Sequence, residues 1–140
     1  MSFKAFIAYA REDRTVAMRL ADILCEQGIG TFVGERDISL GESIEKRTFS
    51  EFSEADMFVM VRSGAAERSS AVQMELGAAW ARGMPIVFVI PSDQPNAAEV
   101  SLPLDFTAAS VLYMDRLSDA ALGAAMRDQV AAHHPEQAAP

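Results

Sequence analysis

Two short, wholly apolar runs constrain the fold of this chain more than any other feature of its sequence. They are Met57–Val61 and Pro85–Ile90, and each has the length of a strand and is far too short to span a bilayer. A strand that is apolar throughout has both faces covered, as in the parallel sheets of α/β proteins. Patterns of helical spacing lie between such runs. The sequence therefore predicts an α/β domain whose parallel sheet carries helices on both faces.

The rest of the chain continues this alternation of strand-like and helix-like patterns. No internal repeat appears, so one domain is expected over residues 1–132, followed by a linker-like tail at residues 133–140. Ligands of such sheets bind outside the carboxyl ends of the strands, here the loops after Tyr9, Val33 and Arg62. The sequence predicts strands at 3–9, 29–33, 57–61, 85–90 and 110–114, helices from Asp13 to Gly28, from Ser43, from Ser70 to Arg82 and from Ser118 to Ala132, and loops at Gly34–Gly41, Ser63–Ser69 and Pro91–Thr107.

The charge of the chain excludes several classes of partner. It has 12 basic and 20 acidic residues and a formal net charge of -8, and its cations are scattered. Direct binding of nucleic acid requires a cationic stripe, and binding to an anionic membrane requires a basic cluster. A few arginines in one cleft would still suffice for a small anionic ligand. Because no secretion signal or membrane-spanning run is evident, we expect a cytoplasmic protein.

The residue types also exclude most nucleotide-binding and nucleophilic chemistries. No Walker loop or G-x-G-x-x-G motif follows the first strand, and no Asp ends the third. Cys25, the single cysteine, lies in an apolar-periodic stretch and is expected to be a buried structural thiol. The adjacent His133 and His134 suggest no metal site, and there is no third histidine to activate a serine or a cysteine. Hydrolysis would therefore depend on a carboxylate.

One carboxylate has an unusual context. Glu75 falls on the expected helix Ser70–Arg82, among apolar and small residues. Two interpretations remain open from the pattern alone. Glu75 is either a solvent-facing residue at a helix edge or a carboxylate at the rim of a cleft that faces the end of the first strand.

Several segments, in order, resemble the motifs of the Toll/interleukin-receptor (TIR) domains. The resemblance covers about residues 3–115. The matching segments are Phe6–Ala10 with Arg11-Glu12-Asp13 (box 1, F-I-S-Y-S), Phe32–Ile44 (the second box and the BB loop after it), Glu54-Ala55-Asp56 with Met57–Val61 and Ser63, Ser69 with Glu75–Ala78 (S-x-W-C-x-x-E-L), and Gly83–Val87 (G-K-P-V-I).

This resemblance implies a flavodoxin-like, doubly wound, five-stranded parallel sheet in the order 2-1-3-4-5. It also implies cleavage of NAD+, as a substrate and not a cofactor, between nicotinamide and ribose. Glu75 would then be the catalytic residue, with NAD+ bound by Tyr9, Ala10, Arg11, Arg36 and Ser69. Such domains commonly act after self-assembly, in prokaryotic antiviral defence or cell suicide, under a fused or separate sensor module. The resemblance assigns assembly contacts to Asp37, Ile38, Leu40 and Gly41 of the BB loop.

A single carboxylate is chemically sufficient for this reaction. Glycosidases normally need two, because one of them protonates a poor leaving group. Nicotinamide in NAD+ is already cationic at the glycosidic nitrogen and departs neutral. One negative charge can then stabilise the ribose cation, while Arg11, Arg14 and Arg36 could meet the pyrophosphate. Tyr9 could stack on a base, and Trp80 either stacks likewise or packs between helices.

The chain departs from the TIR pattern close to Glu75. Ala71 and Val72 stand where the pattern has Trp and Cys, so an aromatic wall of the pocket is missing. This leaves a non-catalytic TIR module that signals by self-association as the alternative to an enzyme. A TIR-like transferase acting on other nucleosides is a third possibility. Whether the product is linear or cyclic ADP-ribose depends on the nucleophile that the pocket admits.

Overall fold

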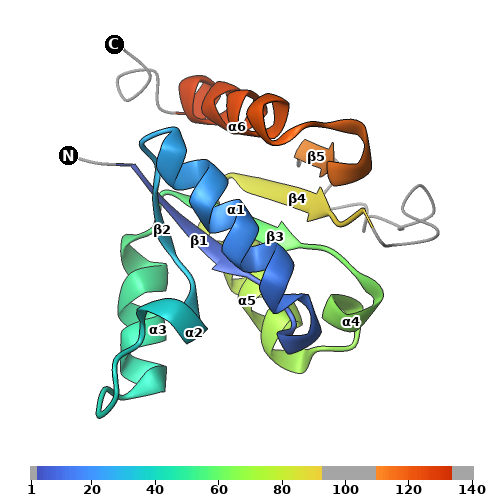
Figure 1. Ribbon diagram of the computed structural model, residues 1–140. Coiled ribbons are helices and arrows are strands. Elements are labelled where there is room, and N and C mark those ends of the chain that lie inside the picture. The colour runs from blue at the N-terminus through green and yellow to red at the C-terminus, as the bar shows by residue number, and fades with distance from the viewer. Residues whose placement is uncertain (1–2, 93–109, 134–140) are drawn as a thin grey trace.

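The fold is a central sheet with helices on both sides (Figure 1). A computed structural model describes residues 3–92 and 110–133, apart from the side chains of Glu35 and Arg36. The elements in chain order are β1 (Lys4–Ala8), the 3-10 turn η1 (Arg11–Asp13), α1 (Arg14–Glu26), β2 (Gly30–Phe32), α2 (Gly34–Asp37), α3 (Ile44–Glu54), β3 (Met57–Val61), α4 (Gly64–Glu67), α5 (Ser70–Arg82), β4 (Ile86–Ile90), β5 (Ser110–Tyr113), the 3-10 turn η4 (Met114–Arg116) and α6 (Asp119–His133).

All five strands are parallel, in the order β2-β1-β3-β4-β5. The prediction of a doubly wound, flavodoxin-like sheet is confirmed. The chain runs from β1 outward to β2 and then returns to β3 on the other side of β1. Doubly wound sheets bind ligands at this reversal of strand order, outside the carboxyl ends of the strands. The carboxyl end of β1 is therefore where a site should be sought.

The two faces of the sheet carry separate hydrophobic cores. Alternate residues of β1 point to opposite faces, as the pleat requires: Ala5 and Ile7 pack beneath α1 and α6, whereas Phe6 and Ala8 pack beneath α3 and α5. Strand β3 is buried along its whole length. The continuous apolar run in the sequence reflects this burial on both faces.

Two predicted loops contain short helices. Residues 34–37 form α2, within the loop expected at Gly34–Gly41, because the side chain and the backbone of Asp37 both fold back onto Val33. Residues 64–67 form α4, within the loop expected at Ser63–Ser69. Ser63 caps α4, since its Oγ accepts a hydrogen bond from the backbone N–H of Ala66 at 3.0 Å.

The prediction that Cys25 is a buried thiol is wrong. Cys25 is exposed, because α1 buries the adjacent Leu24 and turns the next position outward. Asp13 directly precedes α1, as expected, but its side chain makes no capping hydrogen bond to that helix.

The ends of the other elements differ slightly from the predicted ones. Helix α6 extends through His133 and so beyond the expected end at Ala132. Strand β5 ends at Tyr113 and passes directly into η4. The loop predicted at Pro91–Thr107 lies, from residue 93 onward, outside the described residues.

Candidate active site

A cleft of about 620 Å³ lies at the carboxyl end of β1. Its walls come from the end of β1 and η1, from the segment between β2 and α3, and from the first turns of α3 and α5. The cleft therefore occupies the position that doubly wound sheets use for ligands. The lining residues are Phe6, Ile7, Ala8, Tyr9, Ala10, Arg11, Phe32, Gly34, Ile38, Ser39, Leu40, Gly41, Glu42, Ile44, Thr48, Ser69, Ala71, Val72 and Glu75.

Glu75 lines this cleft from the second turn of α5. Its neighbours Val72 and Leu76 are buried against the sheet, so Glu75 lies at the edge of the buried face of α5 and is itself partly buried. Burial raises the pKa of Glu75 from 4.5 to about 7, because the ionised carboxylate loses hydrating water. A carboxyl group that titrates near neutral pH inside a cleft is a candidate catalytic group.

Three predicted binding residues follow β1 directly and line the cleft. Tyr9 is partly buried and also packs against the core beneath α1 and α6. Ala10 is buried at the start of η1, and Arg11 is exposed at its first position. Among the described side chains that line the cleft, Arg11 is the single cation. The edge of the cleft near η1 is thus suited to an anionic part of a ligand.

The start of α5 contributes Ser69, Ala71 and Val72 to the cleft. Ser69 caps the helix, since its Oγ accepts a hydrogen bond from the backbone N–H of Val72 at 3.3 Å. A hydroxyl group that accepts one bond can still donate its proton to a ligand. Ala71 is exposed and Val72 is buried. The positions where the TIR pattern has Trp and Cys therefore form part of the cleft wall.

The predicted assembly residues divide into two groups. Ile38, Leu40 and Gly41 line the cleft, and the side chain of Leu40 is fully exposed. Asp37 does not line it. Its Oδ2 accepts a hydrogen bond from the backbone N–H of Val33 at 2.7 Å, which holds α2 in place. Of Arg36, the backbone lies in α2 and the side chain lies outside the described part of the chain.

Glu42 also lines the cleft, although no role was predicted for it from the sequence. Its Oε1 accepts a hydrogen bond from the backbone N–H of Ser39 at 2.7 Å. The spacing Ser-x-x-Glu of residues 39–42 resembles the capping box of helix N-termini, in which a glutamate reaches back to a backbone N–H, although here it closes a turn before α3, whose N-cap is Ser43. This signal could have identified Glu42. Arg14 and Trp80, considered above as possible ligand contacts, are not part of the lining.

Within residues 3–92 and 110–133, no group of three His, Cys, Asp or Glu side chains is arranged to hold a metal ion. In the same part of the chain, no helix combines the length and the apolarity needed to cross a membrane.

Comparison with known proteins identifies the family. The sequence pattern of the TIR domain matches residues 5–127. Among solved structures, the TIR domain of the Toll-related receptor TRR-2 from Hydra magnipapillata is similar, with a TM-score of 0.68, 20% identity, and coverage of 89% of this chain and 96% of that one. The Clostridium botulinum CMP N-glycosidase BcmB is also similar, with a TM-score of 0.52, 15% identity, and coverage of 88% and 97%. None of the curated proteins matches this chain. Since the family pattern extends over most of the sequence and the fold agrees with it, this chain belongs to the family of TIR domains.

Proposed function

We propose that this TIR domain is an NAD+ nucleosidase that cleaves the bond between nicotinamide and ribose. The products are nicotinamide and ADP-ribose, or a cyclic form of it if a group of the substrate replaces water as the nucleophile. The observation that carries the proposal is the partly buried carboxyl group of Glu75 in a cleft whose single described cation is Arg11. This arrangement offers a negative charge for a ribose cation and a positive charge for a pyrophosphate.

The reaction balances without an acid for the leaving group. The bond from ribose C1′ to the pyridinium nitrogen breaks, and its electron pair neutralises that nitrogen. Nicotinamide leaves as a neutral molecule. Water then adds to C1′ and releases one proton, which completes ADP-ribose. The protein has to stabilise the positive charge that develops on the ribose, and one carboxylate can do this in a site of low polarity.

In this mechanism Glu75 acts as the ionised, catalytic group. Burial in the protein alone raises its pKa to about 7, and the positive nicotinamide ring of a bound substrate would favour the ionised form. Arg11 would bind the pyrophosphate, together with Arg36 from α2, and Tyr9 would contact a base. Ser69 would donate a hydrogen bond to the substrate, and the backbone at Ala10 would border it.

We infer that self-association activates the enzyme. The fully exposed side chain of Leu40 borders the cleft together with Ile38 and Gly41, so a second copy that binds these residues would complete the wall of the site. Asp37 would support this surface by holding α2. A fused or separate sensor module would control assembly, in a cytoplasmic response such as prokaryotic antiviral defence.

Two alternatives rest on specific observations. The small side chains of Ala71 and Val72 in the cleft wall favour a TIR module that associates without catalysis. The raised pKa of Glu75 would suit an acid that protonates a neutral nucleobase, and a CMP N-glycosidase shares the fold. The second alternative predicts base release from CMP and none from NAD+.

The test is release of nicotinamide from NAD+ at high protein concentration with a crowding agent. Wild type should release nicotinamide and Glu75→Gln should not. The glutamine keeps the shape of the side chain, so the loss would report the missing charge. Equal release by both proteins would remove Glu75 from its role. If neither protein is active, fusion to an oligomerising scaffold distinguishes an enzyme that lacks its activator from a module without catalysis.

A further inference from the structure

We propose that Arg47 is a positioning residue of the cleft. It fixes residues 38–43, named here the cleft loop, in the conformation that forms one wall of the ligand site. Arg47 itself does not line the cleft. The inference rests on the proposed function only in taking NAD+ as the ligand. Arg47 contacts the cleft loop through Glu42 and the sheet through Glu51.

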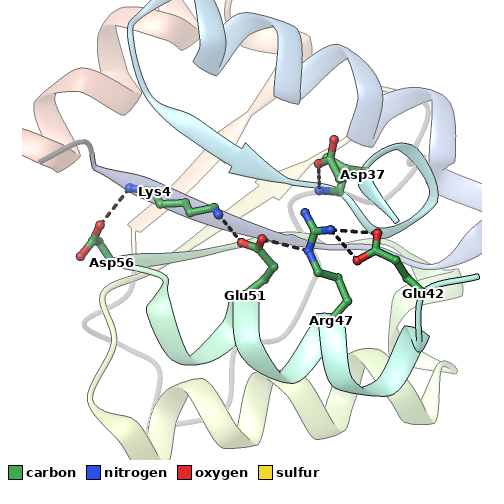
Figure 2. Close-up of polar contacts among 7 residues, drawn as sticks. Lys4, Asp37, Glu42, Arg47, Glu51 and Asp56 are labelled. Carbon is green, nitrogen blue, oxygen red and sulfur yellow. Dashed lines mark hydrogen bonds and ion pairs between the residues drawn. The ribbon is translucent and has the colours of Figure 1, made fainter. Parts of the chain in front are cut away.

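Toward the loop, Arg47 binds Glu42 with both carboxylate oxygens engaged. Its Nη1 lies 3.0 Å from Oε1 and 3.0 Å from Oε2 of Glu42 (Figure 2). The same carboxylate accepts the backbone N–H of Ser39, and the backbone N–H of Glu42 donates to the carbonyl of Ser39 at 3.1 Å. The hydrogen bond from Ser39 and then that from Arg47 lower the pKa of Glu42. One carboxylate thus connects the turn of the cleft loop to the guanidinium group.

Toward the sheet, Arg47 is held by groups outside the loop. Its Nε donates to Oε1 of the buried Glu51 at 3.1 Å, and Glu51 forms an ion pair with Lys4 of β1 (Figure 2). The backbone N–H of Lys4 in turn donates to Asp56 at 2.9 Å. Desolvation alone would raise the pKa of Glu51, but the bonds from Lys4 and Arg47 outweigh it and the pKa is lowered.

The aromatic core provides a further support for the guanidinium group. Its central carbon lies 5.6 Å from the centroid of the Phe32 ring, within the range of a cation–π contact. Phe32 is buried at the end of β2 and packs against Phe6 of β1. Arg47 is therefore attached to parts of the molecule that do not belong to the cleft loop.

The cleft loop depends on these polar contacts because it has little apolar packing of its own. Leu40 is fully exposed, and residues 39–43 are all exposed. Ile38 is the residue of the loop that packs against the core beneath α3 and α5. Gly41 has a φ of +88°, which a residue with a side chain rarely adopts. A segment with few buried apolar contacts opens easily unless other interactions hold it.

The ion pair of Arg47 with Glu42 also neutralises a negative charge at the cleft. Glu42 lines the cleft from the segment before α3, and an unpaired carboxylate there would repel the pyrophosphate of NAD+. Arg47 offsets this charge while it holds the loop. Its guanidinium group binds two carboxylates at once, Glu42 through Nη1 and Glu51 through Nε, in a fixed planar geometry that the ammonium group of a lysine does not reproduce.

The test compares Arg47→Gln and Glu42→Gln with Arg19→Gln. The control removes the exposed ion pair of Arg19 with Asp119, which joins α1 to α6 away from the cleft. In both test variants, amide hydrogen exchange at residues 38–43, measured by mass spectrometry without ligand, should be about fivefold faster than in wild type. This factor is the largest that the loss of one exposed ion pair is expected to produce. Peptides of β1 and β3 should be unchanged, and the control should match wild type throughout.

Kinetics provide the second readout. The KM for NAD+ should rise several-fold in Arg47→Gln, which frees the loop and leaves the charge of Glu42 unpaired, and less in Glu42→Gln, which only frees the loop. The change in kcat should be smaller, and Arg47→Lys should restore only part of the loss. Unchanged exchange at residues 38–43 in Glu42→Gln would overturn the proposal. This variant leaves Glu51 paired with Lys4 and with Arg47, so it should fold and remain informative even if Arg47→Gln fails to fold. If wild type does not cleave NAD+ even when fused to an oligomerising scaffold, the proposed function fails, and the exchange result still decides the role of Arg47.

Discussion

The hydroxyl group of Ser63 donates a hydrogen bond to the carboxylate of Asp13, 50 residues away in the sequence. Both residues are buried, with 2% and 7% of their surface exposed. The same hydroxyl oxygen accepts the backbone N–H of Ala66 at 3.0 Å. Ser63 therefore joins the turn after β1 to the helix after β3, and it fixes these two segments relative to each other at the carboxyl edge of the sheet.

Ser63→Ala should lower the free energy of unfolding by about 2–4 kcal/mol. A buried carboxylate loses a donor, and the N-terminus of α4 loses its cap. Urea denaturation measures the loss. Ser43→Ala is a matched control, because Ser43 caps α3 at an exposed site, where its Oγ accepts the backbone N–H of Lys46 at 3.3 Å. That variant should lose about 1 kcal/mol, and equal losses in the two variants would show that the Asp13 contact adds nothing.

The fold was predictable because its signals are local. Strand β3 is buried on both faces and its sequence is apolar throughout, so one segment reports its own environment. Glu75 was found in a similar way, as a charge within an apolar helix whose context also matched a family motif. No local pattern contained the raised pKa of Glu75, since its burial depends on how α5 packs against β1 and β3.

The errors concern the orientation and the hydrogen-bond partners of individual side chains, which the spacing of apolar residues does not reveal. Helix α2 depends on Asp37 folding back onto Val33, and the side chain of Asp13 pairs with Ser63 and does not cap α1. Cys25 is exposed directly after the buried Leu24, and the spacing of apolar residues does not resolve which of two adjacent positions faces the sheet. Arg47 connects a loop to a strand, and its own neighbours in sequence do not indicate this.

The pH dependence of the rate should report the ionisation of Glu75. Its pKa of about 7 is raised by burial, so the catalytic, ionised form is scarce at pH 6 and prevalent at pH 8. We expect kcat/KM for NAD+, which reports groups of the free enzyme, to increase as the pH rises through about 7. A rate that falls over the same range would assign Glu75 the role of an acid and favour a neutral base as the leaving group.

The same group should make stability depend on pH. Its pKa is about 7 in the folded chain and the ordinary value of 4.5 in the unfolded chain, so the folded state binds more protons between these values. The stability that proton binding by Glu75 adds to the folded chain is fully present below pH 4.5 and is lost as the pH rises through about 7. Glu75→Gln does not titrate and should gain about 1–3 kcal/mol over wild type across this range.

Thermal or urea unfolding at pH 4.5, 6 and 8 measures this gain. Glu42→Gln is a control of opposite sign, because the pKa of Glu42 is lowered by Ser39 and Arg47. Glu42 stabilises the fold above the unfolded pKa, so its replacement should be less stable than wild type at neutral pH, and the difference should vanish as the pH falls. Parallel stability curves for wild type and Glu75→Gln would contradict the burial of a titrating carboxyl group.

Ala71→Trp should strengthen binding of NAD+. Ala71 is exposed, lines the cleft and occupies the position where the TIR pattern has Trp, so an indole ring there would extend the wall beside Glu75 and offer a surface for stacking. The KM for NAD+ should fall about threefold to tenfold, the range expected of one aromatic contact, with little change in kcat.

The control for this variant is Ala78→Trp, which places the same ring on an exposed position of α5 that does not line the cleft. Steady-state kinetics at fixed protein concentration distinguish the two variants. A fall in KM for both would indicate a general effect of surface aromatic groups on assembly. A fall for Ala71→Trp alone would locate the substrate between the start of α5 and the end of β1, because Ala71 and Tyr9 then lie on walls of the same occupied cleft.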